Sequence, residues 1–173
     1  LDDTLKDKKE QNKFLLEIAT TYMEELFQYC AAQTITVVLC DQDGIIIDGK
    51  ASRNTWSKLE KTHFLPGSDW SEETEGTNAI GTAIRENKPV QVFSAEHYCQ
   101  GWHPWICSAA PIHDPFTKQM IGVLDMTGEK RLVQAHDIYM VASQVHKIEQ
   151  AIGSHLMAQN MRSLQSLFDT IQE

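Results

Sequence analysis

The sequence predicts an α+β fold, in which a mainly antiparallel sheet carries helices on one side. The chain has 173 residues, of which 42% are hydrophobic and 23% charged, as in an ordinary globular domain. Alternating apolar residues, typical of strands, occupy the middle of the chain, and apolar residues at three- and four-residue steps, typical of helices, occupy both ends. The predicted order is a helix, two strands, helices, three strands and a helix, without an internal repeat.

The first predicted element is a long amphipathic helix over residues 5–30, where apolar side chains recur at three- and four-residue steps. A strand follows over 34–41, with its odd-numbered apolar residues on one face. The turn at 41–44, in which Gly44 supplies a left-handed backbone conformation, leads into a returning strand over 45–48. The chain therefore starts with a helix and a hairpin.

The next segment contains shorter elements. A short helix is expected over 54–61 and a turn at 65–68, and Ser71 with the acidic residues after it can cap another helical turn. Residues 78–86 predict a helix that ends before a proline, and residues 90–94 predict a strand.

A second hairpin supplies the remaining strands. Residues 95–105 are expected to form an irregular or partly helical connection. The segments 106–113 and 120–127 have the composition of strands, and the turn-forming residues 114–118 join them.

A long helix is predicted from residue 132 onward, with a stripe longer than a small sheet can cover. The terminal helices are therefore expected to form a dimer bundle, and the alternative is a helix packed back onto its own domain. Gly153 interrupts the stripe and marks a weak point or a bend. The apolar residues of the stripe are Ile138, Val141, Val145, Ile148, Ile152, Met161, Leu164, Phe168 and Ile171.

These elements divide the chain into three predicted parts. Residues 1–33 form an N-terminal helix, residues 34–131 form the core, and residues 132–173 form a C-terminal helix. The chain begins with Leu1 and not with Met, so we expect it to be a piece of a longer protein.

The charge balance argues against one class of partner. Lys and Arg number 15 against 24 Asp and Glu, which gives a formal net charge of −9. Affinity for nucleic acids depends on clustered Lys and Arg, so we expect no direct nucleic-acid binding. No apolar run approaches the ~20 residues that span a bilayer, and no signal-peptide pattern is visible. The expected location is the cytoplasm, without membrane contact.

The four cysteines are Cys30, Cys40, Cys99 and Cys107, and no CxxC pair occurs among them. Without a secretory signal, we expect free thiols in a reducing compartment.

Three segments, 75–84, 107–112 and 121–128, are rich in small residues and poor in charge. Small residues let a backbone approach another backbone or a ligand closely. The chain carries no complete catalytic signature, so this pattern favours a domain that holds a molecule over an enzyme that transforms one. We expect no cofactor, no resident metal and no catalytic residue.

Five motifs follow one another along the chain: Gly67-Ser68-Asp69-Trp70-Ser71-Glu72, Gly76-Thr77-Asn78-Ala79-Ile80-Gly81-Thr82-Ala83-Ile84, Glu96-His97-Tyr98-Cys99, Trp105-Ile106-Cys107-Ser108-Ala109-Ala110-Pro111-Ile112-His113-Asp114-Pro115 and Gly122-Val123-Leu124-Asp125-Met126-Thr127-Gly128. Together they resemble a GAF domain. More narrowly, they resemble the sensory domain of bacterial sigma-54-dependent transcription activators of the acetoin-catabolism-regulator type, with dihydroxyacetone-operon regulators as close relatives. The resemblance covers about residues 34–150, and it is the joint occurrence of the motifs that is specific.

The resemblance implies a sensing module that precedes an ATPase domain and a DNA-binding helix-turn-helix. This chain has no Gly-x4-Gly-Lys-[Ser/Thr] phosphate loop, so we expect it to be the receiver portion alone. The implied partners are a small-molecule effector, such as acetoin or a related polyol or ketone, a second copy of the chain, and the ATPase and DNA-binding domains of the parent protein. The terminal helices would relay effector binding to those domains.

We expect the effector pocket to lie over the sheet, where GAF-like domains bind ligands. Its walls would be the helix that starts at Asn78, the 95–105 connection, and the strands at 107–111 and 121–125. The candidate ligand-binding residues are Asn78, Thr82, His97, Tyr98, Trp102, Cys107, Ala109 and Asp125.

Simpler interpretations compete with ligand binding at several of these positions. Asn78 is either a plain helix cap or a ligand contact. Asp125, in the middle of an apolar strand, either orients a ligand hydroxyl or bonds Thr127 or a loop amide. Trp102 is a candidate lid over the pocket. Gly81 inside a helix indicates close packing on the sheet or over a pocket.

Two further classes of function remain open. One is a module that binds a protein partner and has no small ligand. The other is a thiol-based redox or metal sensor, because the segment 97–107 carries His97, Cys99, His103 and Cys107. Their spacing matches no zinc finger or knuckle. The two cysteines would suit a GAF-fold methionine-sulfoxide reductase, but the surrounding motifs do not resemble that family.

Overall fold

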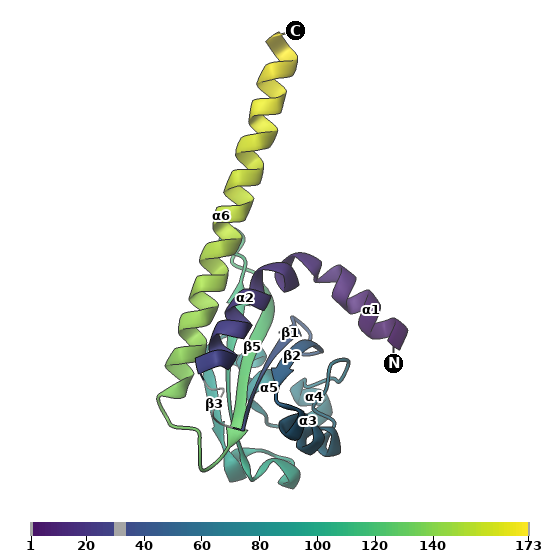
Figure 1. Ribbon diagram of the computed structural model, residues 1–173, viewed down its shortest axis with the longest axis vertical. Coiled ribbons are helices and arrows are strands. Elements are labelled where there is room, and N and C mark those ends of the chain that lie inside the picture. The colour runs from purple at the N-terminus through teal and green to yellow at the C-terminus, as the bar shows by residue number, and fades with distance from the viewer. Residues whose placement is uncertain (1, 30–33, 173) are drawn as a thin grey trace.

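One antiparallel sheet forms the centre of the molecule. The computed structural model describes residues 2–29 and 34–172. Within these residues five strands pair in the order β2–β1–β5–β4–β3 (Figure 1). The predicted α+β fold is thereby confirmed. The strands are β1 (Ile35–Asp41), β2 (Ile46–Ala51), β3 (Val90–Phe93), β4 (Trp105–His113) and β5 (Met120–Glu129).

Six α-helices surround the sheet within the same described residues. They are α1 (Asp2–Gln11), α2 (Lys13–Tyr29), α3 (Arg53–Leu59), α4 (Glu72–Glu75), α5 (Ala79–Glu86) and α6 (Asp137–Gln172). Short 3-10 turns at Glu60–Thr62, Ser94–Glu96 and Gln100–Trp102 complete the connections, so the segment 95–105 is partly helical as predicted.

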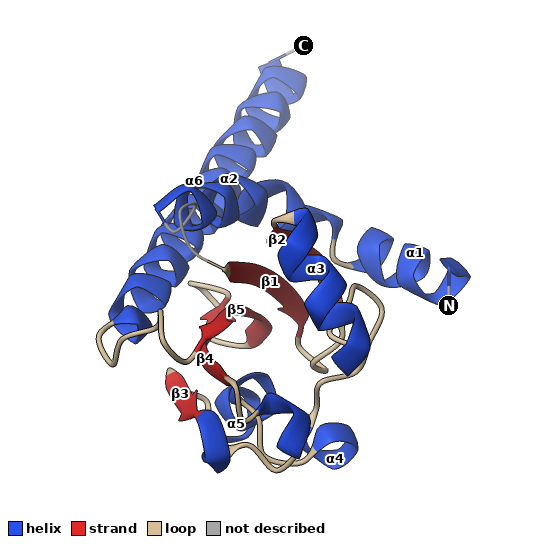
Figure 2. Cartoon of the chain, turned by 60° about the horizontal axis from the view of Figure 1, so that its bottom comes forward, coloured by secondary structure: helices blue, strands red, loops and turns tan. Residues whose placement is uncertain are grey.

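The helices cover both faces of the sheet, and the prediction of helices on one side is wrong. α2 and α6 pack on the face that carries Val37 and Leu39, whereas α3 and α5 lie over the face that carries Val38 and Cys40 (Figure 2). Every residue of β1 is buried, as in a strand enclosed on both sides. The apolar run at 37–40 is the signal for this arrangement.

The predicted N-terminal helix over 5–30 is two helices that meet at Asn12. The Asn12 side-chain amide donates to the Lys8 carbonyl over 2.8 Å, which is the local competition with helical bonds that short amide side chains offer. α1 then leans on the β1–β2 turn, where the Lys8 ammonium lies 2.8 Å from Asp41 and 2.9 Å from Asp43. Hydrogen bonds to these carboxylates raise the pKa of Lys8 to about 12. Residue 30 of the predicted helix lies outside the described residues.

The two predicted hairpins are present. Gly44 adopts φ +91° in the β1–β2 turn, so its predicted left-handed conformation is confirmed. β4 and β5 pair along their length and form the longest ladder of the sheet. β5 is the central strand, because it pairs with β1 on one side and β4 on the other.

α6 starts at Asp137, five residues later than predicted. The Asp137 carboxylate accepts from the backbone amide of Gln134 over 2.9 Å and so holds the turn that precedes the helix. It then runs without interruption through Gly153 to Gln172. The first half packs on the sheet through Val141, Val145, Ile148 and Ile152. The second half leaves the body of the molecule (Figure 1), and its apolar side chains are exposed.

Gly81 stands where α5 meets the start of α4. A Cβ atom at this position would lie 2.5 Å from the Glu72 amide nitrogen, so the close packing predicted for Gly81 occurs against α4 and not against the sheet. At Gly153 a Cβ would meet Pro115 at an ordinary 3.4 Å. A Cβ atom therefore fits at Gly153 but not at Gly81.

We expect Gly81→Ala to lower the free energy of unfolding by about 1–3 kcal/mol, because the clash with backbone outweighs the helix propensity gained. Gly153→Ala is the matched control and should raise it by about 0.5–1 kcal/mol. Urea denaturation of both variants measures the difference. Equal or higher stability of Gly81→Ala would contradict the close contact between α4 and α5.

Candidate functional site

Asp125 lies at the centre of the sheet, on the face covered by α5. In the strand register it pairs with Val38 of β1 and with Ala109 of β4. The side chain is fully buried, and the Thr127 hydroxyl donates to its Oδ2 over 2.7 Å. Its Oδ1 has no hydrogen-bond partner among the described residues. Burial raises the pKa of Asp125 to about 7, and the Thr127 hydrogen bond opposes this only in part.

Small side chains enclose this carboxyl group. Ala109 is fully buried, and α5 packs on β4 and β5 with Ala79 and Ala83 also buried. Small residues on both the helix and the strand let the two backbones approach closely. The small-residue segments noted in the sequence therefore meet at Asp125.

The Asn78 side chain forms hydrogen bonds within the fold. Its Oδ1 accepts from the Gly81 amide over 2.9 Å, and its Nδ2 donates to the Gly76 carbonyl over 2.9 Å, so Asn78 caps α5. The Thr82 hydroxyl donates to the Glu72 carboxylate of α4. Both candidate residues thus have internal partners in this structure.

Trp102 is the middle of an aromatic cluster and is 2% exposed. Its ring centroid lies 4.9 Å from that of Phe64, 4.8 Å from that of Trp70 and 5.9 Å from that of Trp105. The predicted lid is therefore packed into the core of this face. Phe64 and Trp70 belong to this site, although neither was a candidate residue. Trp70 lies in the sequence motif at 67–72, and Phe64 precedes the predicted turn at 65–68.

His97 lies beside Trp102, with ring centroids 5.9 Å apart. Its Nδ1 is 2.9 Å from the Ser94 carbonyl oxygen, and its Nε2 has no partner among the described residues. Burial lowers the pKa of His97, so the ring is neutral at neutral pH. The next residue, Tyr98, is 78% exposed and lies over Gly76. Of the eight candidates, Tyr98 is therefore the one exposed residue, Thr82 is partly buried, and the other six are buried.

The Cys107 and Cys99 thiols lie in different environments. Burial, with a smaller contribution from Asp125, raises the pKa of the Cys107 thiol well above its usual range, whereas a nucleophilic thiol needs a lowered pKa. Cys99 is exposed. Cys40, Cys99 and Cys107 are free thiols, and Cys30 lies outside the described residues. Within residues 2–29 and 34–172, no three His, Cys, Asp or Glu side chains gather as metal ligands.

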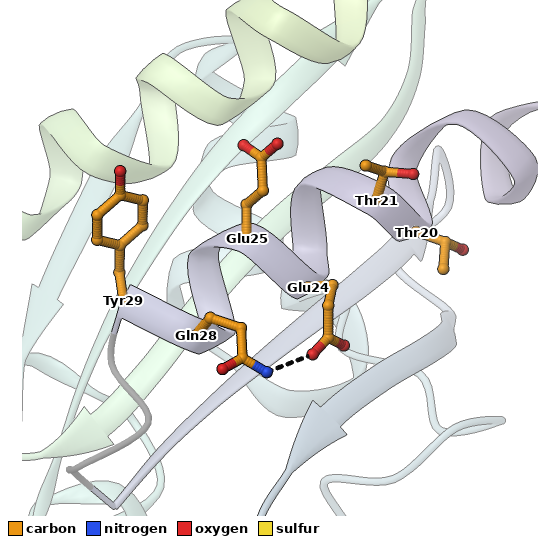
Figure 3. A pocket seen from close by; sticks show the side chains of 6 residues that line it. All are labelled: Thr20, Thr21, Glu24, Glu25, Gln28 and Tyr29. Atoms are coloured by element: carbon orange, nitrogen blue, oxygen red, sulfur yellow. Dashed lines mark hydrogen bonds between the residues drawn. The ribbon is translucent and has the colours of Figure 1, made fainter.

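A broad hollow of about 870 Å³ runs along α2, far in sequence from the predicted pocket (Figure 3). Its lining is polar and acidic, and the Gln28 amide donates to Glu24 over 2.7 Å. Glu25 pairs with Lys147 of α6 at 3.1 Å, and the figure shows Glu25 and Tyr29 directed toward that helix. No sequence motif marked these residues.

No helix in the described part of the chain is long and apolar enough to cross a membrane.

The fold belongs to the GAF-like class. The GAF-like fold is shared with the GAF domain/HD domain protein of Geobacter sulfurreducens, with a TM-score of 0.54 at 13% identity, over 83% of this chain and 94% of that one. The N-terminal part of Escherichia coli DhaR, in its complex with DhaL, matches with a TM-score of 0.88 at 19% identity, over 96% of this chain and 56% of that one. The predicted GAF-like fold is confirmed.

The sequence defines the family. Residues 5–150 match the family described as MimR, N-terminal domain, and the chain belongs to this family. It is 32% identical over 123 residues to the acetoin dehydrogenase operon transcriptional activator AcoR of Bacillus subtilis, covering 71% of this chain and 20% of AcoR. Across its curated relatives the match covers 16% to 29% of their length. The chain is therefore the kind of N-terminal regulatory domain that transcriptional activators of this family carry.

The raised pKa of Asp125 predicts a specific pH dependence. The folded state keeps the proton up to about pH 7, whereas the unfolded state releases it near pH 3.8, so this group's stabilisation is complete at low pH and is lost as the pH rises through 7. Asp125→Asn removes the titration and should gain up to about 4 kcal/mol relative to the wild type between pH 4 and pH 7.

The difference in unfolding free energy between the two proteins, measured by urea denaturation across this range, isolates Asp125. Carboxylates with lowered pKa values, such as Asp69 and Asp114, titrate alike in both proteins and cancel. A difference that does not change with pH would show that Asp125 ionises normally.

Proposed function

We propose that the chain is the effector-sensing domain of a sigma-54-dependent transcription activator. Its effector is a small neutral metabolite that carries hydroxyl or carbonyl groups, such as acetoin or a related polyol or ketone. The observation that carries this proposal is the unpartnered Oδ1 of Asp125, which is fully buried at the centre of the sheet. Burying such an atom without a hydrogen bond costs free energy that a ligand hydroxyl would recover.

The surroundings of Asp125 restrict the ligand. The residues on this face beside it include the buried Ala79, Ala83 and Ala109, so a compact ligand is the easiest to admit, and an additional charge would be as costly to bury here as the carboxylate itself. With a pKa of about 7, Asp125 has both donor and acceptor forms at neutral pH. It can therefore accept from a hydroxyl or donate to a carbonyl.

The segment 94–104 would have to move aside to admit the effector. Ser94 adopts φ +48°, a conformation that L-residues rarely occupy, and its hydroxyl donates to the His103 carbonyl over 2.5 Å. Between them lie His97, whose Nε2 lacks a partner among the described residues, and Trp102, which closes the face. Opening of this segment would expose Asp125 from the side opposite α6.

Two structural links support a relay from this face to α6. Alternate residues of β5 belong to opposite faces, so Leu124 and Met126 pack in the same cluster as Val145 and Ile148 of α6. At the end of the sheet, the His113 ring nitrogens lie 2.7 Å from Asn87 Oδ1 and 3.2 Å from Glu149 Oε1. Asn87 ends α5 and Glu149 belongs to α6. If α6 has two arrangements, an effector can shift the balance between them only if the domain binds it with a different affinity in each arrangement.

The exposed half of α6 supports a homodimer as the output state. The residues 157, 161, 164, 168 and 171 are apolar, alternate in steps of four and three, and are each 52–72% exposed. This is the spacing of a coiled-coil seam. The ATPase and DNA-binding domains of the parent protein would receive the signal through this helix, in the cytoplasm and without direct nucleic-acid binding by this chain.

A second candidate function is a protein-sensing module without a small ligand. The specific observation that favours it is the filled face, where Phe64, Trp70 and Trp102 pack edge to face with centroids 4.8–4.9 Å apart. DhaR(N), which has the same fold, is known in complex with DhaL. Under this proposal the surface of the domain, and not its interior, carries the specificity.

Native mass spectrometry with acetoin, 2,3-butanediol, dihydroxyacetone and glycerol distinguishes these proposals. We expect one compound to add a single mass per chain, with affinity at least about tenfold weaker in Asp125→Asn, because one buried hydrogen bond is altered. Asp114→Asn, at a partly buried carboxylate outside the site, is the control. If none of the compounds binds, the protein-sensing proposal is favoured.

The dimer proposal has its own test. Leu164→Glu with Phe168→Glu places charges in the seam and should convert a dimer into a monomer without lowering the helical content of the body. Light scattering coupled to size-exclusion chromatography measures the mass. Tyr139→Glu, at a side chain that is 74% exposed on the body half of α6, is the control and should remain dimeric. A monomeric wild type would refute the proposed seam.

A further inference from the structure

A groove of about 830 Å³ lies at the end of the sheet where β4 begins and β5 ends. Four of its lining side chains are cationic: Lys58 and Lys61 come from α3 and the turn after it, and Lys130 and Arg131 follow β5. Pro104 and Trp105 provide its apolar part. This combination occurs on a chain with a formal net charge of −9, so the groove is a local reversal of the overall charge.

The lining contains one carboxylate, and it is already engaged. Glu129 accepts from the Lys58 ammonium and from Arg131 Nε, the latter over 2.9 Å. The Lys58 hydrogen bond, more than that of Arg131, holds the pKa of Glu129 below its usual range, so it is ionised at neutral pH. One carboxylate cannot neutralise four cations, and the groove keeps a positive surplus.

Lys61 and Lys130 carry this surplus. Both are exposed, and neither forms an ion pair with the acidic side chains of the described residues. The backbone beneath them is fixed, because the Lys130 amide donates to the Pro104 carbonyl over 2.8 Å and Trp105 pairs with Glu129 in the β4–β5 ladder. The groove therefore presents two lysines without ion pairs beside a hydrogen-bonded, partly apolar surface.

We propose that this groove docks an acidic segment of a partner protein that also carries apolar side chains. The carboxylates would meet Lys61 and Lys130, and an apolar side chain would cover the exposed Pro104 beside the buried Trp105. An acidic partner is repelled by the rest of this acidic surface, so the groove is where its approach is favoured. This inference does not depend on an effector at Asp125.

Other occupants fit less well. A nucleic acid would need an extended track of cations, and the net charge of −9 repels a polyanion at every other point of the surface. A second copy of the chain has its unpartnered apolar stripe on α6, which projects from the opposite end of the molecule (Figure 1). The groove therefore stays accessible when that helix is engaged.

The test is a heteronuclear NMR titration of the chain with a capped synthetic peptide in which Glu and Asp alternate with Leu and Phe. We expect the Trp105 indole N–H and the amides of Lys130 and Arg131 to shift, and the shifts to weaken as salt shortens the ~10 Å screening length. Lys61→Glu with Lys130→Glu should weaken binding at least about tenfold at low salt. These two lysines hold no ion pair with the described residues, so the variant is expected to remain folded.

Lys6→Glu with Lys118→Glu is the matched control, because both lysines are exposed, lie away from the groove and form no ion pair with the described residues, and the net charge changes equally. It should bind the peptide with the affinity of the wild type. The proposal fails if the acidic peptide does not bind, if the groove variant binds as well as the control, or if a peptide with Gln and Asn in place of Glu and Asp binds equally. Preferential binding of single-stranded DNA at the same amides would also overturn it, in favour of a nucleic-acid site.

Discussion

The burial of β5 on both faces is the constraint on which the rest of this structure depends. β5 is the central strand, and its alternate side chains enter two different cores. Leu124 and Met126 pack beneath α2 and α6, while Val123 and Asp125 lie beneath α5. Any displacement of this strand is therefore felt by both layers of helices, because close-packed cores have little free volume in which to absorb it.

Asp125 is the exception to this apolar strand, and the cost of burying it explains much of its neighbourhood. A fully buried carboxyl group is tolerated because it is protonated over much of the pH range and shares one hydrogen bond with Thr127. A regulatory role gives such a residue a purpose, since a domain selected for maximal stability would replace it with an apolar side chain. The family shows that this is a regulatory domain, and the part that Asp125 plays in it is our proposal.

The sequence was sufficient for elements whose signals are local. The alternation at Ile35, Val37 and Leu39, the glycine of the first turn and the capping asparagine of α5 each depend on a few neighbouring residues, and the structure agrees with them. The break at Asn12 was missed, because apolar spacing continues across it and the competing amide bond has no periodic signature. The covering of both faces was also missed, since it depends on where distant helices dock.

The candidate site shows the same limit. The anomaly of a carboxylate in an apolar strand was visible in the sequence, and so was its possible bond to Thr127. The burial of Trp102 was not, because it depends on contacts with Phe64 and Trp70, which are distant from it in the sequence. The basic groove likewise gathers Lys58, Lys61 and Lys130 from positions that are 72 residues apart at the extremes, within a chain whose total charge has the opposite sign.

The projecting half of α6 turns a small tilt at its base into a larger displacement at its C-terminal end. The residues from 153 to 172 form a rigid rod about 30 Å long, since each helical residue adds about 1.5 Å. A tilt of about five degrees at its base would carry the far end through about 2.6 Å by this geometry, with little change in the packing of Ile148 or Ile152. In a dimer of two such helices, a small rearrangement of the sheet would therefore change the distance between their C-terminal ends or their rotation relative to each other.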